Sequence, residues 1–394
     1  MRAGPAVFTT GLKVGAPAAI LVASVFMPQD QPSPGLEAIL LVGGQGTRLR
    51  PLTIGVPKPL LPTAGVPFLA HQLSRVAEAG VSRVVLATAY RAQMFADSLG
   101  DGSAFGLEIC YIQEDTPLGT GGAIRNAAAG LRGGPGDAVI VLNGDILSGH
   151  DLTAQVKAHY EARAAVTLHL VEVEDPSRFG CVPTDAEGRV TAFLEKTPDP
   201  VTNRINAGCY VFRREVIDVI PPGVVSSVER KIFPELISAG EVVFGYVDGA
   251  YWLDVGTPEA FVTGSCDLVL GRMTSPALSA ANGLPGECLL LAGAVVEPGA
   301  SVGGGTVAGA GSVIEMGAQV TRSVLFDGAR VGRGARVADS VLGRGAQIAA
   351  GVVLEGAVIG DGAVIAEGNE LRAGARVWPD VTLVPTSVRF STDA

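Results

Sequence analysis

The chain has 394 residues, of which 47% are hydrophobic and 17% are charged, and its formal net charge is −10. This composition is globular and leaves room for two domains, whereas the 53 glycines follow no strict three-residue period. Collagen and intrinsic disorder are therefore excluded. The negative balance argues against binding to nucleic acid or to an anionic membrane, and it favours a small-molecule ligand in a local basic pocket.

The cysteines and the N-terminal segment give information about the cellular location of the protein. Five cysteines lie far apart without any CxxC spacing, which favours neither zinc nor redox chemistry and predicts reduced side chains in a cytoplasmic protein. The apolar run at 18–27 is too short to span the ~30 Å hydrocarbon core of a membrane. We expect residues 1–35 to be a disordered or misassigned N-terminal extension.

Strand and helix patterns alternate from residue 36 to residue 272, which predicts an α/β domain with a Rossmann-like, mostly parallel mixed sheet covered on both faces. Ligands of such sheets bind beyond the carboxyl ends of the strands. The glycine-rich loop after Val42 and the carboxylate of Asp145 should meet there. In chain order we expect a strand at 37–42, a helix at 67–80, a strand at 83–88, a further helix, a strand at 107–112, a helix at 119–131 and a strand at 138–145.

The composition changes after residue 272. A stretch rich in Pro, Ser, Ala and Gly predicts a linker at 273–289, and glycines then recur at six-residue spacing. Twelve of these glycines are each followed three positions later by an apolar residue, a regularity that a low-complexity tail would not keep. The pattern predicts a left-handed parallel β-helix of hexapeptide repeats at 290–381, followed by a C-terminal tail at 382–394.

The segment at 41–62, LVGGQGTRLRPLTIGVPKPLLP, carries the strongest chemical signal. It is neither a P-loop nor a dinucleotide fingerprint. Its glycines let backbone N–H groups approach an anion closely, while Arg48 and Lys58 add two positive charges and two prolines stiffen the backbone around Lys58. A lone GGxG would more often be a surface turn with solvated basic side chains. The complete segment instead favours an anion-binding loop.

This segment resembles the nucleotide-binding signature of the sugar-1-phosphate nucleotidyltransferases. Further blocks resemble that family in the same order: PLGTGGAI, VLNGD, FLEKT, INAGCYVF, SVERKIFP and YWLDVGTP. The resemblance extends over residues 36–394, and the wording of the blocks together with the C-terminal repeat is most similar to mannose-1-phosphate guanylyltransferases of the actinobacterial type.

The resemblance implies a role for each matching residue. Asp145 and Asp254 would hold Mg²⁺, which prefers one or two carboxylates plus phosphate oxygens. Arg48 would neutralise the departing pyrophosphate, and Lys58 would contact the reacting α-phosphate. The nucleotide would contact Leu41, Gly43, Gly44, Gly46, Thr47, Gly119, Thr120 and Gly121. The sugar phosphate would contact Gly180, Glu195, Lys196 and Asn206.

The implied reaction is transfer of a nucleotidyl group from GTP to mannose-1-phosphate, giving GDP-mannose and pyrophosphate. A glucose-1-phosphate enzyme that uses UTP or dTTP is the alternative within the class, because a few pocket contacts decide the base. A non-catalytic, nucleotide-sugar-binding regulatory subunit is the alternative from another class, although such subunits tend to lose charged site residues. Acyl transfer by the β-helix is disfavoured because all four histidines precede the repeat. We expect a homo-oligomer.

Overall fold

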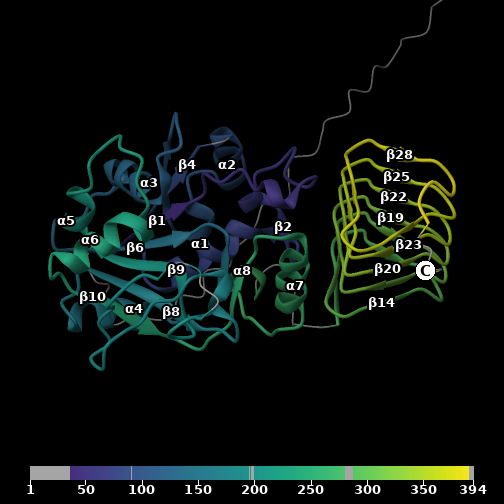
Figure 1. The fold of residues 1–394 in the computed structure, drawn as a ribbon. Coiled ribbons are helices and arrows are strands. Elements are labelled where there is room, and N and C mark those ends of the chain that lie inside the picture. The colour runs from purple at the N-terminus through teal and green to yellow at the C-terminus, as the bar shows by residue number, and fades with distance from the viewer. Residues whose placement is uncertain (1–35, 90, 195, 197–198, 280–286, 390–394) are drawn as a thin grey trace, which may run out of the picture.

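The computed structural model describes residues 36–89, 91–194, 196, 199–279 and 287–389, so the predicted N-terminal extension lies outside the described residues. Figure 1 shows a layered α/β domain beside a stack of β-helix coils. The α/β domain is built on one sheet with the strand order β10-β8-β9-β6-β1-β4-β5. These strands are β1 (Glu37–Leu41), β4 (Arg83–Thr88), β5 (Glu108–Gln113), β6 (Ala138–Asn143), β8 (Val166–Glu172), β9 (Arg204–Arg213) and β10 (Val243–Val247).

The predicted mixed sheet is confirmed. β1 pairs in parallel with β4 and β6, whereas β9 runs antiparallel to both β6 and β8. Two short antiparallel pairs complete the domain. One is formed by β2 (Pro62–Thr63) and β3 (Val66–Pro67), and the other by β7 (Ile146–Ser148) and β11 (Trp252–Asp254).

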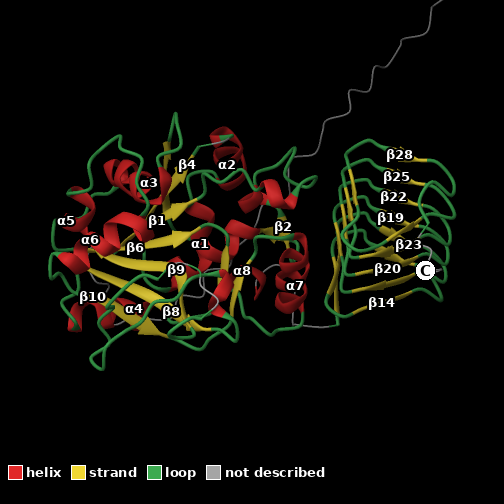
Figure 2. Ribbon diagram, in the orientation of Figure 1, coloured by secondary structure: helices red, strands yellow, loops and turns green. Residues whose placement is uncertain are grey.

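Helices cover both faces of the sheet, as the alternating pattern predicts, and Figure 2 shows this layering. Leu40 points to the face covered by α1, where it packs with Leu73, while the adjacent Ile39 points to the opposite face and packs with Ile124 of α3. Such burial on both faces explains the continuous apolar runs of the central strands. The helices are α1 (Phe68–Glu78), α2 (Ala92–Leu99), α3 (Gly119–Ala127), α4 (Leu152–Glu161), α5 (Arg214–Asp218), α6 (Phe233–Ser238), α7 (Pro258–Val269) and α8 (Pro276–Ser279).

The short helical turns are η1 (Thr47–Leu49), η2 (Lys58–Leu60), η3 (Ser103–Phe105), η4 (Ala128–Gly130), η5 (Pro176–Arg178) and the π-helical η6 (Val228–Ile232). Within the segment predicted as a linker, α8 packs through Ala277 in the same core as α1, and residues 280–286 lie outside the described residues. No helix in the described part of the chain is long and apolar enough to cross a membrane. All five cysteines lie in the described ranges, and all are free thiols.

The C-terminal repeat forms three parallel sheets whose strands come from successive coils, as expected for a β-helix. The twelve glycines predicted at the corners all have positive φ, which is the conformation that favours glycine. The twelve apolar residues that follow them fill one interior cluster. The strands are β12 (Cys288–Leu290), β13 (Val295–Val296), β14 (Ser301–Gly303), β15 (Thr306–Ala308), β16 (Val313–Ile314), β17 (Gln319–Thr321), β18 (Val324–Leu325), β19 (Arg330–Val331), β20 (Arg336–Ala338), β21 (Val341–Leu342), β22 (Gln347–Ile348), β23 (Val353–Glu355), β24 (Val358–Ile359), β25 (Val364–Ile365), β26 (Glu370–Leu371), β27 (Arg376–Val377) and β28 (Thr382–Leu383).

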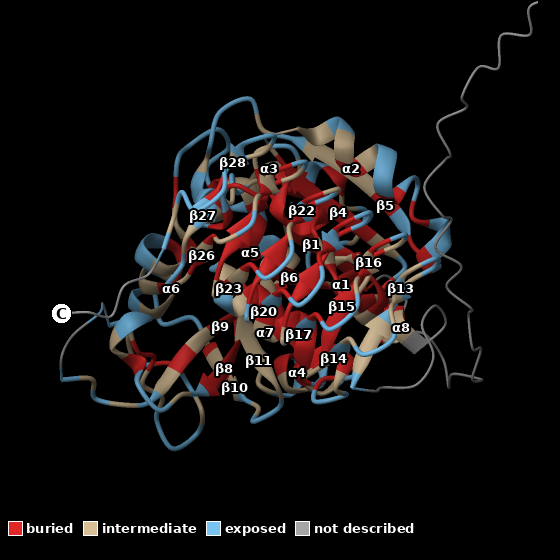
Figure 3. Cartoon of the chain, turned by 90° about the vertical axis from the view of Figure 1, so that its right-hand side faces the viewer, coloured by how far each residue is buried: buried red, intermediate tan, exposed pale blue. Residues whose placement is uncertain are grey.

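One sheet of the β-helix packs on the α/β domain through α7. Outward-facing valines of β15, β18, β21 and β24 share a buried cluster with Phe261 and Val262 of α7. Phe261 also meets Phe326 edge to face, with ring centroids 6.3 Å apart. Figure 3 shows buried residues in the central strands of the sheet and on the β-helix coils in front of them. The two domains therefore share an apolar interface.

Candidate functional site

The glycine-rich loop begins where β1 ends and brings its two basic residues to the same place. Gly46 has a φ of 61°, and a Cβ there would lie only 2.9 Å from Cβ of Lys58. Glycine is therefore required for the loop to pass against Lys58. The Thr53 hydroxyl donates to the Gly46 carbonyl at 2.8 Å and fixes this turn. Pro57 and Pro59 flank Lys58, whose side chain is buried in η2.

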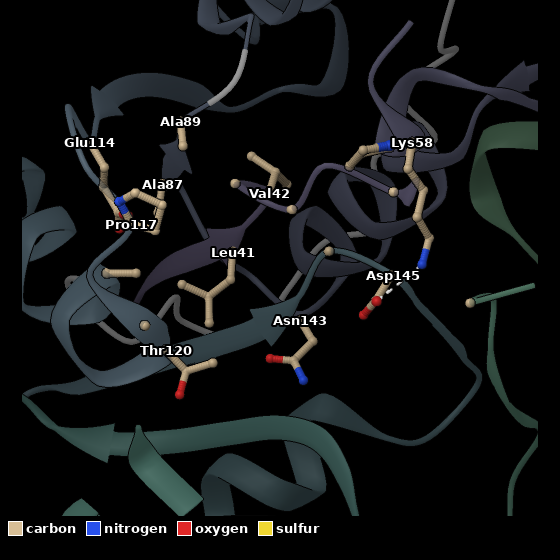
Figure 4. Close-up of a pocket in the computed structure, with 18 of the residues that line it drawn as sticks. Leu41, Val42, Lys58, Ala87, Ala89, Glu114, Pro117, Thr120, Asn143 and Asp145 are labelled. Carbon is tan, nitrogen blue, oxygen red and sulfur yellow. Dashed lines mark hydrogen bonds and ion pairs between the residues drawn. The ribbon is translucent and has the colours of Figure 1, made fainter. Parts of the chain in front are cut away.

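A cavity of about 470 Å³ opens at the carboxyl ends of β1 and β6. The two strands are parallel neighbours with Leu41 in register with Asn143, so the loop after β1 and the turn after β6 converge. Lys58 Nζ donates to Asp145 Oδ2 at 3.0 Å, which joins the two segments. Figure 4 shows this pair on one side of the cavity and Glu114, Pro117 and Thr120 on the other. Ten residues predicted from sequence line it: Leu41, Gly43, Gly44, Gly46, Thr47, Arg48, Lys58, Gly119, Thr120 and Asp145.

The start of α3 borders the cavity at the end away from Lys58. Gly119 and Thr120 line it, whereas Gly121 is not among the lining residues. The Gly121 N–H donates to the Ser226 carbonyl at 2.8 Å, and a Cβ on Gly121 would lie 2.6 Å from Ser226 Oγ. The close approach of α3 to Ser226 accounts for this glycine.

Glu114 also lines this end of the cavity, although its residue type carried no signal in the sequence. Its Oε2 accepts the N–H of Leu118 at 3.2 Å, while Oε1 is buried and has no hydrogen-bond partner among the described residues. Burial raises the pKa of Glu114, and the bond from Leu118 opposes that rise. Glu114 thus brings to this end of the cavity a carboxyl oxygen that has no hydrogen-bond partner within the described residues.

Asp145 and Asp254 lie next to one another because β7 and β11 are paired. Asp254 is in register with Ile146, and the Val255 N–H donates to the Asp145 carbonyl at 3.0 Å. Burial raises the pKa of Asp254 and the charge of Asp145 raises it further, whereas Lys58 and Arg48 act in the opposite direction. A positive charge placed between the two carboxylates would relieve this repulsion.

The chemistry of the two aspartates fits a divalent metal ion. The described residues contain no group of three or more His, Cys, Asp or Glu side chains that could hold a metal. However, Asp254 Oδ1 is buried without a hydrogen-bond partner among them. Two carboxylates with a free oxygen suit an ion that takes its remaining ligands from substrate phosphates and water.

A second cavity, of about 600 Å³, adjoins the first and shares Asn143 and Asp145 with it. Gly180, Lys196, Asn206 and Asp254 line it, and Glu195 lies outside the described residues. The Asn206 amide donates to the Tyr210 hydroxyl at 2.9 Å and accepts the Gly208 N–H at 3.1 Å, so its orientation is fixed. The structure thus separates the predicted nucleotide residues from the predicted sugar-phosphate residues and places Asp145 between them.

Sequence reasoning missed three further features of the two cavities. Phe179 and Trp252 line the second cavity with edge-to-face rings 5.7 Å apart, an apolar surface of the kind that contacts a sugar ring. Glu229 links the two cavities, because it accepts from Thr120 Oγ1 at 3.2 Å and from the Tyr210 hydroxyl at 3.3 Å. The SVERKIFP block contains Glu229, so the block was a signal for this residue.

Gly256 is the third missed position. It lines the first cavity directly beside Arg48, and a Cβ on it would lie 2.7 Å from Arg48 Nη2 and 3.0 Å from Cζ. The guanidinium group therefore lies against the backbone after β11. Only glycine allows this approach without displacing the side chain.

Comparison with known proteins decides the family. The nucleotidyl transferase family model matches residues 37–269. The chain belongs to the nucleotidyl transferase family. A second match, to the GMPPB C-terminal domain, covers residues 284–387. The family predicted from the sequence motifs is confirmed.

Several relatives of this nucleotidyl transferase have names that describe a reaction. Mannose-1-phosphate guanylyltransferase of Mycobacterium tuberculosis is 58% identical over 91% of this chain and 98% of its own length. Probable mannose-1-phosphate guanylyltransferase 1 of Oryza sativa subsp. japonica is 36% identical over 75% of this chain and 82% of its own length. The crystal structure of HddC from Yersinia pseudotuberculosis, also solved in complex with GMP-PN, matches with a TM-score of 0.51 and 30% identity over 58% of this chain and 98% of that one.

Proposed function

We propose that this nucleotidyltransferase uses GTP and mannose-1-phosphate to make GDP-mannose and pyrophosphate. The observation that carries the proposal is the pair of adjoining cavities that share Asp145, one lined by Arg48 and Lys58 and the other by Lys196. Two adjoining sites with basic side chains suit a reaction that joins two phosphorylated compounds. The names of the relatives from M. tuberculosis and O. sativa support the choice of substrates.

The chemistry follows from the charges. A phosphate oxygen of the sugar-1-phosphate attacks the α-phosphorus in line, the bond from the α-phosphorus to the bridging oxygen breaks, and pyrophosphate leaves with that electron pair. The attacking oxygen is already anionic at neutral pH, so no general base is needed. We assign Lys58 to the α-phosphate, and Arg48 with the loop of Gly43, Gly44, Gly46 and Thr47 to the departing phosphates. Positioning and charge neutralisation then account for most of the rate enhancement.

We assign the base to the end of the first cavity at Leu41, Gly119 and Thr120. Guanine presents two neighbouring donors, N1–H and the 2-amino group, and a carboxylate accepts such a pair well. The buried, unpartnered Oε1 of Glu114 supplies an acceptor at this end. HddC, 30% identical, has been crystallised with GMP-PN, which agrees with a guanine nucleotide in this type of site.

We assign the sugar phosphate to the second cavity, at Gly180, Glu195, Lys196 and Asn206, and Mg²⁺ to Asp145 and Asp254. When bound, the ion supplies positive charge that the phosphate oxygens share. Lys58 also offsets part of the negative charge of the two carboxylates, through its 3.0 Å bond to Asp145 and its charge near Asp254. The domain limits at 36–272 and 290–381, a homo-oligomeric state and a cytoplasmic location complete the proposal.

A substrate panel tests the proposal. Pyrophosphate release is measured with GTP, UTP and dTTP, each paired with mannose-1-phosphate or glucose-1-phosphate, and GTP with mannose-1-phosphate should be fastest. Faster release with dTTP or UTP and glucose-1-phosphate would replace the substrates but keep the reaction class. No release with any pair, together with measurable binding of nucleotide sugar, would instead favour the regulatory subunit.

Glu114→Gln provides a matched variant for the base assignment. The amide keeps the side-chain shape and one acceptor but brings two N–H donors toward the guanine donors. We expect KM for GTP to rise by about tenfold or more, because a bond to a charged group contributes about 1.5–3 kcal/mol. An unchanged KM for GTP would remove Glu114 from base recognition.

A further inference from the structure

Arg376 of the β-helix reaches the glycine-rich loop of the catalytic domain. Its Nη1 donates to the carbonyl of Arg48 at 2.9 Å and to the carbonyl of Arg50 at 2.8 Å, although 326 or more residues separate these positions in the chain. The two carbonyls belong to the middle residue of η1 and to the residue that follows η1. A residue from the C-terminal domain therefore holds the backbone that carries Arg48.

The strand register makes Arg376 exceptional on its face of the β-helix. Val307, Val324, Val341 and Val358 stand in register on β15, β18, β21 and β24, and all four belong to the apolar cluster against α7. Arg376 is the next residue in this register, on β27. The four valines contact the apolar side of α7. On the next coil the same position lies against the polar backbone of the loop, and there the residue is arginine. This change matches the five N–H donors of a guanidinium group, which has no acceptor.

The loop that Arg376 contacts is tightly turned. Within it, the N–H groups of Leu49 and Arg50 donate to the carbonyls of Gly46 and Thr47 at 3.0 and 3.2 Å. The Arg48 and Arg50 carbonyls accept from Arg376. The Arg48 side chain meanwhile lies against Gly256. The backbone of Arg48 is thus held by one domain, while its guanidinium group rests on the other.

We infer that Arg376 is a positioning residue for nucleotidyl transfer: it holds the η1 backbone so that the Arg48 guanidinium group stays in the nucleotide cavity. The inference rests on the proposed function, because it assigns Arg48 to the reacting phosphates. Arg376 itself is not among the residues that line the nucleotide cavity, so it acts through Arg48. The β-helix then contributes to the chemical step through one side chain.

Kinetics of three variants in the full-length chain test this role. Arg376→Ala removes both bonds, Arg376→Lys restores one cation with a flexible stem, and Arg372→Ala is the matched control. Arg372 lies between β26 and β27, four residues before Arg376, and pairs with Glu355 at 2.9 Å and with Glu370 at 3.6 Å, all within the repeat. We expect Arg376→Ala to lower kcat by about tenfold, since a small misplacement of a catalytic group has a large effect on rate. KM for the sugar phosphate should stay within about twofold, Arg376→Lys should recover part of the loss, and Arg372→Ala should match the parent chain.

A double-mutant cycle separates positioning from simple loss of domain packing. In an Arg48→Ala background, Arg376→Ala should cause no further loss of kcat, because the group that it positions is absent. An equal loss in both backgrounds would overturn the inference, as would a wild-type kcat for Arg376→Ala. A loss that accompanies a large drop in Tm, without rescue by Arg376→Lys, would also overturn it.

Hydrogen exchange distinguishes a failure of this inference from a failure of the proposed function. Without any substrate, the Leu49, Arg50 and Leu52 amides should exchange faster in Arg376→Ala than in the parent chain or in Arg372→Ala, because the turn bonds of η1 open more often. Unchanged exchange would overturn the positioning role. Absence of guanylyl transfer in the parent chain, with faster exchange in the variant, would overturn only the proposed function.

Discussion

Replacing Gly256 with alanine should slow catalysis by moving Arg48. A Cβ at Gly256 would lie 2.7 Å from Arg48 Nη2, whereas ordinary contact begins at about 3.4 Å, so the guanidinium group must retreat by about 0.7 Å. A misplacement of ~1 Å can cost about a hundredfold in rate, and we therefore expect kcat to fall by about 10- to 100-fold. This corresponds to roughly 1.4–2.7 kcal/mol in the activation barrier.

The assay is pyrophosphate release at saturating GTP and mannose-1-phosphate, with Tm measured on the same samples. Gly256 does not have a positive φ and its new neighbour is the flexible end of a side chain, so Tm should change little. Gly249→Ala is the matched control, because a Cβ at Gly249 meets nothing within 4 Å. A wild-type kcat in Gly256→Ala, or a loss that Gly249→Ala shares, would refute the reasoning.

Three further predictions concern the carboxylates and a buried histidine. Asp145→Asn and Asp254→Asn should each lower kcat by about a hundredfold or more, since each removes a metal-ligand charge, and unchanged turnover in both would contradict the assignment. Glu229→Gln should raise KM for both substrates by up to about tenfold. Glu229 accepts from Thr120 beside the first cavity and from Tyr210 beside the second, and Tyr210 is the partner of Asn206. A change in KM for one substrate alone would contradict this link between the cavities. Burial lowers the pKa of His71 to about 4, so the folded state stays neutral while the unfolded chain takes up a proton below pH ~6.5. Stability should therefore fall as the pH drops from 6.5 toward 4, by about 2 kcal/mol at pH 5 from this group. Urea unfolding at pH 7 and pH 5 should show less pH dependence for His71→Gln, and equal pH dependence would contradict this.

Local patterns in the sequence were sufficient for the elements up to residue 145, for the coils of the repeat and for one half of the site. The loop after Val42 and the turn at Asp145 could be brought together because parallel strands end at one edge of a sheet. The glycine period of the repeat likewise predicted the coils, since each interior position recurs at a fixed offset. The convergence of the loop with Asp145 and the coils of the repeat can each be inferred from local residue patterns and a general rule of topology.

The remaining contacts of the site depend on packing between distant segments, which no local period encodes. Asp254 reaches Asp145 through the short β7–β11 pair, and the resemblance to the family, rather than any pattern, pointed to it. Gly121 was assigned to the base, whereas the structure uses it for close packing on Ser226. Glu114 belongs to none of the quoted blocks, and the YWLDVGTP block contains Gly256 without showing that Arg48 lies against it.

Arg376 follows four valines that stand in register on successive coils. Its position relative to the catalytic domain therefore depends on how many coils precede it. Inserting or deleting one whole coil between Val324 and Arg376 would leave the repeat intact and the docking face apolar. Adjacent strands are about 4.8 Å apart, so Arg376 would be displaced by that distance, which exceeds the length of a hydrogen bond. In this chain the number of coils is therefore constrained by the position of a loop in another domain.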